Sequence, residues 1–250
     1  MKFIHLSDLH IHTHCNDNKD IAMRLDFISK EYPEHKLIIT GDIADDGKVE
    51  QFDNAYNLLE PFIGNIFICP GNHDFGAAGM FYSEERAADF DGLLSEPLKQ
   101  GGTFTGNVTP VVNIVKEDGI KTMFIALDSN LETHTPFDFA CGEIGDYQLR
   151  NLNTILSGNT DMTKILFFHH HPLMHTDPFM ELKDVKKLIE TIYGKVDIVL
   201  FGHKHEMKQW KNMWGVKYIL ASDNSSDKTY AKEITIDKDG ISINEISITL

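Results

Sequence analysis

Five short clusters of polar residues stand out because each follows a run of apolar residues. The clusters are Asp8 with His10, Gly41-Asp42, Gly71-Asn72-His73-Asp74, His169-His170-His171 and Gly202-His203-Lys204-His205. Asp8 and His10 are two positions apart, as are His203 and His205, and in an extended chain such side chains point to the same side. Imidazole, carboxylate and amide oxygen are ligands that suit transition metals such as Mn, Fe and Zn. The clusters therefore predict a transition-metal site.

The candidate ligands are too many for one ion. A tetrahedral zinc site needs about four ligands, whereas seven or more candidates are present in the five clusters. Two ions roughly 3.5–4 Å apart that share a carboxylate would use them all. The alternative is that each Asp or His is an ordinary cap or surface residue, an interpretation that requires five independent coincidences.

The elements that must position these clusters follow from hydrophobic periodicity. Strands are predicted at Phe3–Leu6, Leu37–Thr40, Ile66–Cys69, Val111–Val115, Thr122–Leu127, Ile165–Phe168 and Asp197–Phe201. Helices are predicted at about Lys19–Glu31, Lys48–Phe62, Ser83–Leu94, Gly145–Ser157 and Leu182–Tyr193. Alternation of strands with helices predicts an α/β fold. In such sheets, sites form beyond the carboxyl ends of the strands, which is where the polar clusters lie.

The pattern changes after Gly202, because strands then follow one another without helices. Four runs are expected to be strands, namely Lys208–Trp210, Val216–Ala221, Ala231–Asp237 and Ile241–Ile248, the last two joined by a DKDG turn. We expect this tail to form an antiparallel sheet. The whole chain then predicts two packed mixed β-sheets flanked by helices. No internal repeat or linker indicates a domain boundary.

Composition limits the classes of function. The 250 residues include 23 Lys+Arg and 38 Asp+Glu, a formal net charge of −15 that disfavours binding to a nucleic-acid backbone. The three cysteines, Cys15, Cys69 and Cys141, form no CxxC pair, so free thiols and a reducing compartment are expected. No signal peptide and no apolar run of the roughly 18 residues that a membrane span needs are visible. These features predict a cytoplasmic protein without membrane contact.

Together the five clusters resemble the signature of the calcineurin-like metallophosphoesterases, over residues 8 to 205. The GNHD and HHHP segments, with the segment LDSN…GEIGDYQLRNL at 127–152, look similar to the bacterial branch of class III cyclic-nucleotide and glycerophosphodiester phosphodiesterases. The resemblance implies a calcineurin-like four-layer αββα sandwich in which residues 1–250 form a single metallophosphoesterase domain.

The resemblance also implies roles for individual residues. One metal ion would take Asp8, His10, Asp42 and His205, and the other would take Asp42, Asn72, His203 and one His of the 169–171 run. Asp42 would then bridge two divalent or trivalent ions of Mn, Fe or Zn. The family's His-x-Pro pattern selects His170 through Pro172. His73 would face the substrate, and Asp74 would hold its ring.

The reaction implied is hydrolysis of phosphate esters by a hydroxide that bridges the metals, with small phosphodiesters as the first expectation. The alternatives are a phosphomonoesterase acting on nucleotides or phosphoproteins, a metal-dependent nuclease, and an inactive metal-binding scaffold. Specificity is expected in the loops 75–82, 128–142 and 173–180, with Phe137 and Phe179 as candidate contacts. His134 and His175 are further candidates for substrate contact.

Overall fold

A computed structural model describes residues 1–105, 110–131, 140–158, 161–174, 177–225 and 228–248. Its first sheet has five strands, and β1 lies at the centre. In spatial order they are β13 (Gly240–Ser247), β12 (Tyr230–Asp237), β1 (Lys2–Leu6), β2 (Lys36–Thr40) and β3 (Ile66–Cys69). The strands β1, β2 and β3 are parallel, so their carboxyl ends share one edge, whereas β12 and β13 are antiparallel to their neighbours.

The second sheet has six strands. In spatial order they are β10 (Lys208–Met213), β11 (Val216–Ala221), β9 (Ile198–Phe201), β8 (Thr163–Phe167), β7 (Ile120–Ala126) and β6 (Val111–Glu117). The four inner strands are mutually parallel, and the two edge strands are antiparallel to their neighbours. The carboxyl ends of β8, β9 and β11 therefore also share one edge.

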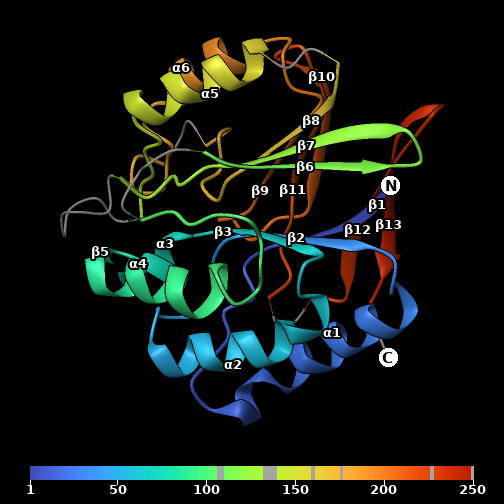
Figure 1. Cartoon of the computed structure of the whole chain (residues 1–250). Coiled ribbons are helices and arrows are strands. Elements are labelled where there is room, and N and C mark those ends of the chain that lie inside the picture. The colour runs from blue at the N-terminus through green and yellow to red at the C-terminus, as the bar shows by residue number, and fades with distance from the viewer. Residues whose placement is uncertain (106–109, 132–139, 159–160, 175–176, 226–227, 249–250) are drawn as a thin grey trace.

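Helices cover the outer face of each sheet, so the chain forms four layers (Figure 1). The first sheet is covered by α1 (Lys19–Glu31), α2 (Val49–Leu59) and α4 (Glu84–Phe90), and the second by α5 (Asp146–Gly158) and α6 (Val185–Ile192). Along the chain, β3 is followed by the single turn α3 (Asn72–Phe75) and by a short hairpin of β4 (Gly76–Ala77) and β5 (Phe81–Tyr82), which precede α4. The expected αββα architecture is confirmed. No described helix combines the length and the apolar character that a membrane crossing requires.

Strand alternation divides the apolar residues between two cores. On β7, Phe124 and Ala126 belong to the core between the sheets, whereas Met123 and Ile125 belong to the core beneath α5 and α6. The ring of Phe124 stacks on Phe67 of β3 at 4.5 Å and joins the two sheets. Full burial of such side chains contributes about 1.5–3 kcal/mol each.

The tail was predicted wrongly as one antiparallel sheet. Its four strands are divided between the sheets: β10 and β11 extend the second sheet, and β12 and β13 extend the first. The strand β11 is moreover parallel to β9. Turn signals in sequence show that two strands are antiparallel to each other, but they do not show which sheet the pair will join.

Two predicted helices are shorter than expected, for local reasons. The helix predicted at 48–62 gives way to a 3₁₀ turn at Glu60–Phe62, which contains Pro61. The helix predicted from residue 182 begins at Val185. The carboxylate of the preceding Asp184 accepts hydrogen bonds from the backbone of Ile144 and Gly145.

Candidate metal centre

The carboxyl ends of five strands from both sheets meet at one place. Asp8, Asp42 and Asn72 follow β1, β2 and β3, and His169 and His203 follow β8 and β9. Backbone hydrogen bonds hold these loops together, including Asp8 N–H to Gly41 O at 3.1 Å and Gly202 N–H to His169 O at 3.0 Å. All five polar residues are almost fully buried. The expected convergence of the five clusters is thus present in the structure.

Close packing explains two of the glycines. A Cβ at Gly71 would collide with the carboxylate of Asp42, and a Cβ at Gly202 would collide with the side chains of Ser7 and Asp8. The absence of a side chain at both positions lets loops from different strands approach each other this closely.

The backbone at the candidate ligands is in an unusual conformation. Positive φ angles occur at Asp8 (56°), His10 (48°), Asp42 (50°), His203 (76°) and His205 (48°). Few non-glycine residues adopt this region, and each instance costs on the order of 1–3 kcal/mol. Five of the eleven described non-glycine residues with positive φ are candidate ligands that turn towards a common point, a grouping that is typical of a functional site.

Asp8, His10 and His205 form the first group of candidate ligands, with their ligand atoms all within 4.8 Å of one another. His205 Nε2 lies 4.0 Å from Asp8 Oδ1, and the rings of His10 and His205 stack at 5.2 Å. His205 Nδ1 lies 3.4 Å from Oδ1 of the buried Asp223. The carboxylate of Asp223 therefore orients the His205 ring so that Nε2 faces Asp8.

Asp42, His169 and His203 form a second, fully buried group. His169 Nε2 lies 3.1 Å from Asp42 Oδ2, 3.0 Å from Asn72 Oδ1 and 3.1 Å from His203 Nδ1. Asn72 donates its Nδ2–H to the Gly79 carbonyl at 2.9 Å, which directs Oδ1 into the group.

The donor set of this second group fits a cation. His169 Nδ1 lies 2.8 Å from the Thr40 carbonyl, which can only accept, so Nδ1 carries the hydrogen. In a neutral ring Nε2 then presents a lone pair to the oxygens of Asp42 and Asn72, a repulsive arrangement unless a proton or metal ion lies between them. Burial lowers the pKa of His169, but the Asp42 carboxylate outweighs burial and raises the pKa to about 9. The geometry thus favours positive charge at this point, as a transition-metal site requires.

Asp42 belongs to both parts of the centre. Its Oδ2 lies 3.9 Å from His10 Nε2 on one side and 3.1 Å from His169 Nε2 on the other. Its Oδ1 accepts the backbone N–H of His73 at 3.0 Å. A carboxylate placed between two groups of imidazoles has the position that a bridging ligand needs.

The structure brings His169, and not the expected His170, to the centre. His170 Nδ1 instead lies 2.8 Å from the Ser129 hydroxyl. His171 donates Nε2–H to Glu206 at 2.9 Å and accepts from Leu173 N–H at Nδ1. Alternation along β8 explains the difference: Phe167 faces the first sheet and Phe168 faces away from it, so His169 faces the first sheet and Asp42. In this structure the strand alternation, and not the spacing to Pro172, therefore indicates the histidine that faces Asp42.

Asp74 has a different role from the one expected. Its carboxylate accepts the backbone N–H groups of Ile43, Ala44 and Gly71 at 3.2, 2.8 and 2.9 Å. It therefore ties together the loops that follow β2 and β3 and does not hold a ring.

The His73 ring is held by another group. Its Nδ1 donates to the Asp45 carbonyl at 2.7 Å, and the ring packs edge-on against His10 at 4.7 Å. Burial lowers the pKa of His73, but the Asp42 carboxylate and the Asp45 carbonyl outweigh burial and raise the pKa above its usual value. His73 thus lies beside the candidate ligands, as expected, with its tautomer set by the backbone.

Asp223 was missed in the sequence. It follows β11, which is parallel to β9 and ends at the same edge of the second sheet. The signal was present, since Asp223 follows the apolar run that ends at Ala221. A tail that formed one separate antiparallel sheet would keep this carboxyl end away from the other five, whereas pairing of β11 with β9 brings it to them.

Two of the loops expected to set specificity meet around a cavity of about 300 Å³. Its lining residues include Phe75 and Tyr82 from one loop and Asp128 and Leu131 from the other. Phe179 of the third loop is exposed. His134, Phe137 and His175 lie outside the described residues.

Comparison with known proteins agrees with the resemblance noted from the five clusters. The sequence pattern of the family described as Calcineurin-like phosphoesterase matches residues 1–207. The 3',5'-cyclic adenosine monophosphate phosphodiesterase of Haemophilus influenzae is 24% identical over 215 residues, which cover 83% of this chain and 67% of that protein. The glycerophosphodiester phosphodiesterase of Enterobacter lignolyticus is 25% identical over 183 residues, which cover 69% of this chain and 58% of that protein.

A solved structure shows the same fold. A dimetal phosphatase from Danio rerio superimposes with a TM-score of 0.72 at 13% identity, covering 100% of this chain and 96% of that one. At this identity the likeness concerns the arrangement of sheets and helices.

Proposed function

We propose, from the premise that this chain belongs to the calcineurin-like phosphoesterase family, that it hydrolyses small phosphodiesters at a centre of two metal ions. The observation that carries the proposal is the position of Asp42, whose Oδ2 faces His10 on one side and His169 on the other. The names of the two relatives, a cyclic-nucleotide and a glycerophosphodiester phosphodiesterase, support a diester substrate.

The ligand assignment follows two of three groups of candidate ligands; in the third, which is His10, Asp42 and His73, the His73 ring is bound through Nδ1 to the Asp45 carbonyl and is given the acid role. Asp8, His10 and His205 would hold one ion, and Asn72, His169 and His203 would hold the other, with Asp42 shared between them. His169 takes the place in this set that spacing alone had given to His170. Imidazole with carboxylate and amide oxygen suits manganese, iron or zinc.

When bound, two such ions would supply an activated water molecule near neutral pH and offset negative charge on the phosphate. The chain's own residues would fix the positions of the ligand oxygens. Asp42 accepts a hydrogen bond from His73 N–H, and Asn72 donates one to the Gly79 carbonyl. Because His73 Nδ1 donates to the Asp45 carbonyl, the ring must be an imidazolium to act as an acid, and the proton on its Nε2 is then the one that can pass to a departing alkoxide. His73 is therefore the proposed general acid.

We place the protein in a reducing compartment such as the cytoplasm. All three cysteines are free, with Cys69 and Cys141 buried and Cys15 exposed. Free thiols in the structure support this proposal, because disulfides are rare in reducing compartments.

The test is turnover of matched aryl esters by manganese-loaded protein. Bis(p-nitrophenyl) phosphate should be hydrolysed with a higher kcat/KM than p-nitrophenyl phosphate, since the former is a diester and the latter a monoester. A preference for the monoester would replace the proposal with a phosphomonoesterase, and no turnover of either ester would leave a metal-binding scaffold. A screen of cyclic nucleotides and glycerophosphodiesters would then identify the natural class.

A further inference from the structure

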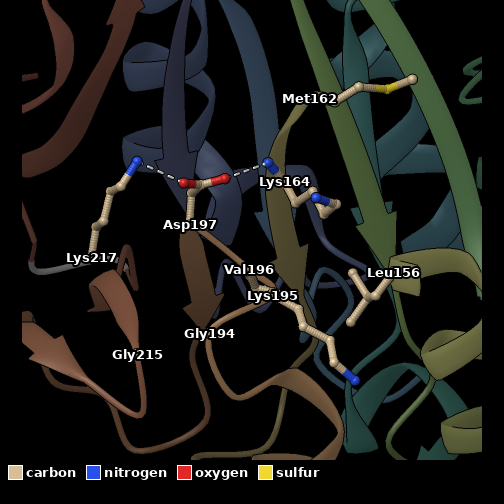
Figure 2. Close-up of a pocket in the computed structure, with 9 residues that line it drawn as sticks. All are labelled: Leu156, Met162, Lys164, Gly194, Lys195, Val196, Asp197, Gly215 and Lys217. Atoms are coloured by element: carbon tan, nitrogen blue, oxygen red, sulfur yellow. Dashed lines mark hydrogen bonds and ion pairs between the residues drawn. The ribbon is translucent and has the colours of Figure 1, made fainter. Parts of the chain in front are cut away.

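A second cavity lies at the edge of the second sheet opposite to the metal centre. It has a volume of about 400 Å³ and is lined by residues at the starts of β8, β9 and β11 and around the ends of α5 and α6 (Figure 2). Lys164 at the start of β8 and His169 beyond its end are five residues apart, which corresponds to roughly 16 Å of extended strand. The cavity is thus a separate site on the same parallel strands.

Lysines give this cavity a positive balance in a chain whose formal net charge is −15. Lys164, Lys195 and Lys217 line it together with a single carboxylate, Asp197. Lys217 Nζ pairs with Asp197 Oδ1 at 2.8 Å, and Asp197 Oδ2 accepts the backbone N–H of Lys164 at 2.9 Å. Lys195 Nζ donates to the neutral Asn153 at 2.8 Å. The lining thus contains one carboxylate and three ammonium groups.

The helix ends reduce this balance but do not reverse it. Leu156 lies in the last turn of α5, and Gly194 follows α6, so both helices present their carbonyl ends near the cavity. Each helix C-terminus carries roughly half a negative charge. Asp161 also interacts electrostatically with Lys164, but its carboxylate is paired with Lys121 at 3.2 Å. The three ammonium groups that line the cavity therefore exceed the sum of its one lining carboxylate and the two helix ends.

Lys164 has the burial expected of a ligand contact. The residue is 6% exposed, and its ammonium group has no hydrogen-bond or ion-pair partner among the residues that the structure describes. It lies on the same face of β8 as Leu166 and Phe168, which belong to the core beneath α5 and α6. The aliphatic stem is therefore packed, and the charged end is delivered to the cavity. A largely buried charge is stable only when it is paired or solvated.

Apolar residues complete the wall. Figure 2 shows Leu156 and Met162 on the same side of the cavity as Lys164, with the Lys217–Asp197 pair on the other side. Such a cavity suits a small molecule with an oxyanion at one end and an apolar group at the other. A tetrahedral phosphate offers several oxygens to ammonium donors on different sides, whereas a carboxylate offers two in one plane.

We propose that this cavity is a binding site for a small phosphate monoester, with the Lys164 ammonium as its main contact. The site is distinct from the metal centre and does not depend on the proposed hydrolysis. Lys195 and Lys217 supply further positive charge, and Leu156 and Met162 contact the organic part of the ligand.

The test uses phenylphosphonate, which mimics a monoester and cannot be hydrolysed. It is titrated into ¹⁵N-labelled, zinc-loaded protein, and the amide signals of Gly194 and Gly215, which line the cavity, report binding there separately from the metal centre. We expect saturable shifts of both signals, with an affinity that falls at least tenfold in Lys164→Met. Lys186→Met is the matched control, because Lys186 is exposed on α6 and its replacement removes the same charge.

Three results would overturn the proposal. The first is the absence of shifts at Gly194 and Gly215, and the second is an equal loss of affinity in the two lysine variants. The third is equal binding of benzoate, which would show that the cavity recognises carboxylates as well as phosphorus oxyanions. Retained ester hydrolysis in Lys164→Met is expected in every case, since Lys164 lies at the opposite end of β8.

Discussion

Asp223 Oδ1 lies 3.4 Å from His205 Nδ1, so a carboxylate at the end of β11 fixes a ring at the end of β9. Asp223 is itself fixed, because the hydroxyl and the backbone N–H of Ser225 donate to the same oxygen at 2.8 and 3.1 Å. The side chain of His205 is 47% exposed and would otherwise be free to rotate. A buried carboxylate thus orients the most exposed of the proposed ligands.

Replacing Asp223 should therefore weaken one metal site and spare the other. In Asp223→Asn the affinity for the ion held by Asp8, His10 and His205 should fall roughly 10–100-fold, the usual effect of losing a carboxylate behind a ligating His. Titration of metal-free protein against a coloured chelator resolves the two affinities. Asp239→Asn, at an exposed turn, is the control. Unchanged affinities in Asp223→Asn would show that the contact does not orient the ring.

The two neighbouring histidines of the 169–171 run should behave differently. His169→Ala should lose one metal ion per chain, because its Nε2 faces Asp42 and Asn72. His170→Ala should keep both ions, because its Nδ1 is bonded to Ser129. Metal content after gel filtration, with folding checked by circular dichroism, measures the difference. Loss of an ion from His170→Ala with retention in His169→Ala would restore the assignment based on Pro172.

His73 should affect chemistry and leave metal content unchanged. In His73→Ala, hydrolysis of a glycerophosphodiester should slow by on the order of 10²–10⁴, because its alkoxide leaves poorly without a proton. Hydrolysis of bis(p-nitrophenyl) phosphate should slow much less, since nitrophenolate departs unprotonated. The ratio of the two kcat values is the measurement. Equal losses would limit His73 to an electrostatic contact.

His5 should make stability depend on pH. Burial, aided by the charge of Lys232, lowers its pKa to about 3, whereas in an unfolded chain the pKa is about 6.5. Between these values the unfolded chain binds more protons, so stability falls as pH falls. From pH 7 to pH 5 the loss from this group is about 2 kcal/mol.

The matched variant isolates that effect. His5→Gln keeps a polar atom for the Thr40 hydroxyl, which His5 Nε2 contacts at 2.9 Å, but it cannot take up a proton. Denaturant unfolding of metal-free protein at pH 7 and pH 5 should show a smaller loss for His5→Gln than for the parent chain. The exposed His14→Gln should behave like the parent. The account of His5 fails if all three chains lose the same stability.

Local sequence carried enough information for the strands and for most of the centre. Apolar runs marked the ends of β1, β2, β3, β8 and β9, and the polar residue after each run reached the common site. Residue types and the parallel direction of these strands were sufficient because neighbouring carboxyl ends must share an edge.

Information about tertiary contacts was missing from the sequence pattern. The choice between His169 and His170 depends on which face of β8 meets the other sheet, and Asp223 was overlooked because β11 pairs with β9 rather than with the rest of the tail. The carboxylate of Asp74 is bound by amides from two loops, and neighbours in sequence do not reveal these partners.

The most direct test of the dinuclear centre is calorimetric titration of metal-free protein with manganese. The arrangement of Asp42 between the two groups predicts binding of two ions per chain, with hydrolysis of bis(p-nitrophenyl) phosphate appearing when both sites are filled. Saturation at one ion, or full hydrolysis with one ion bound, would contradict the shared role of Asp42 and with it the proposed centre.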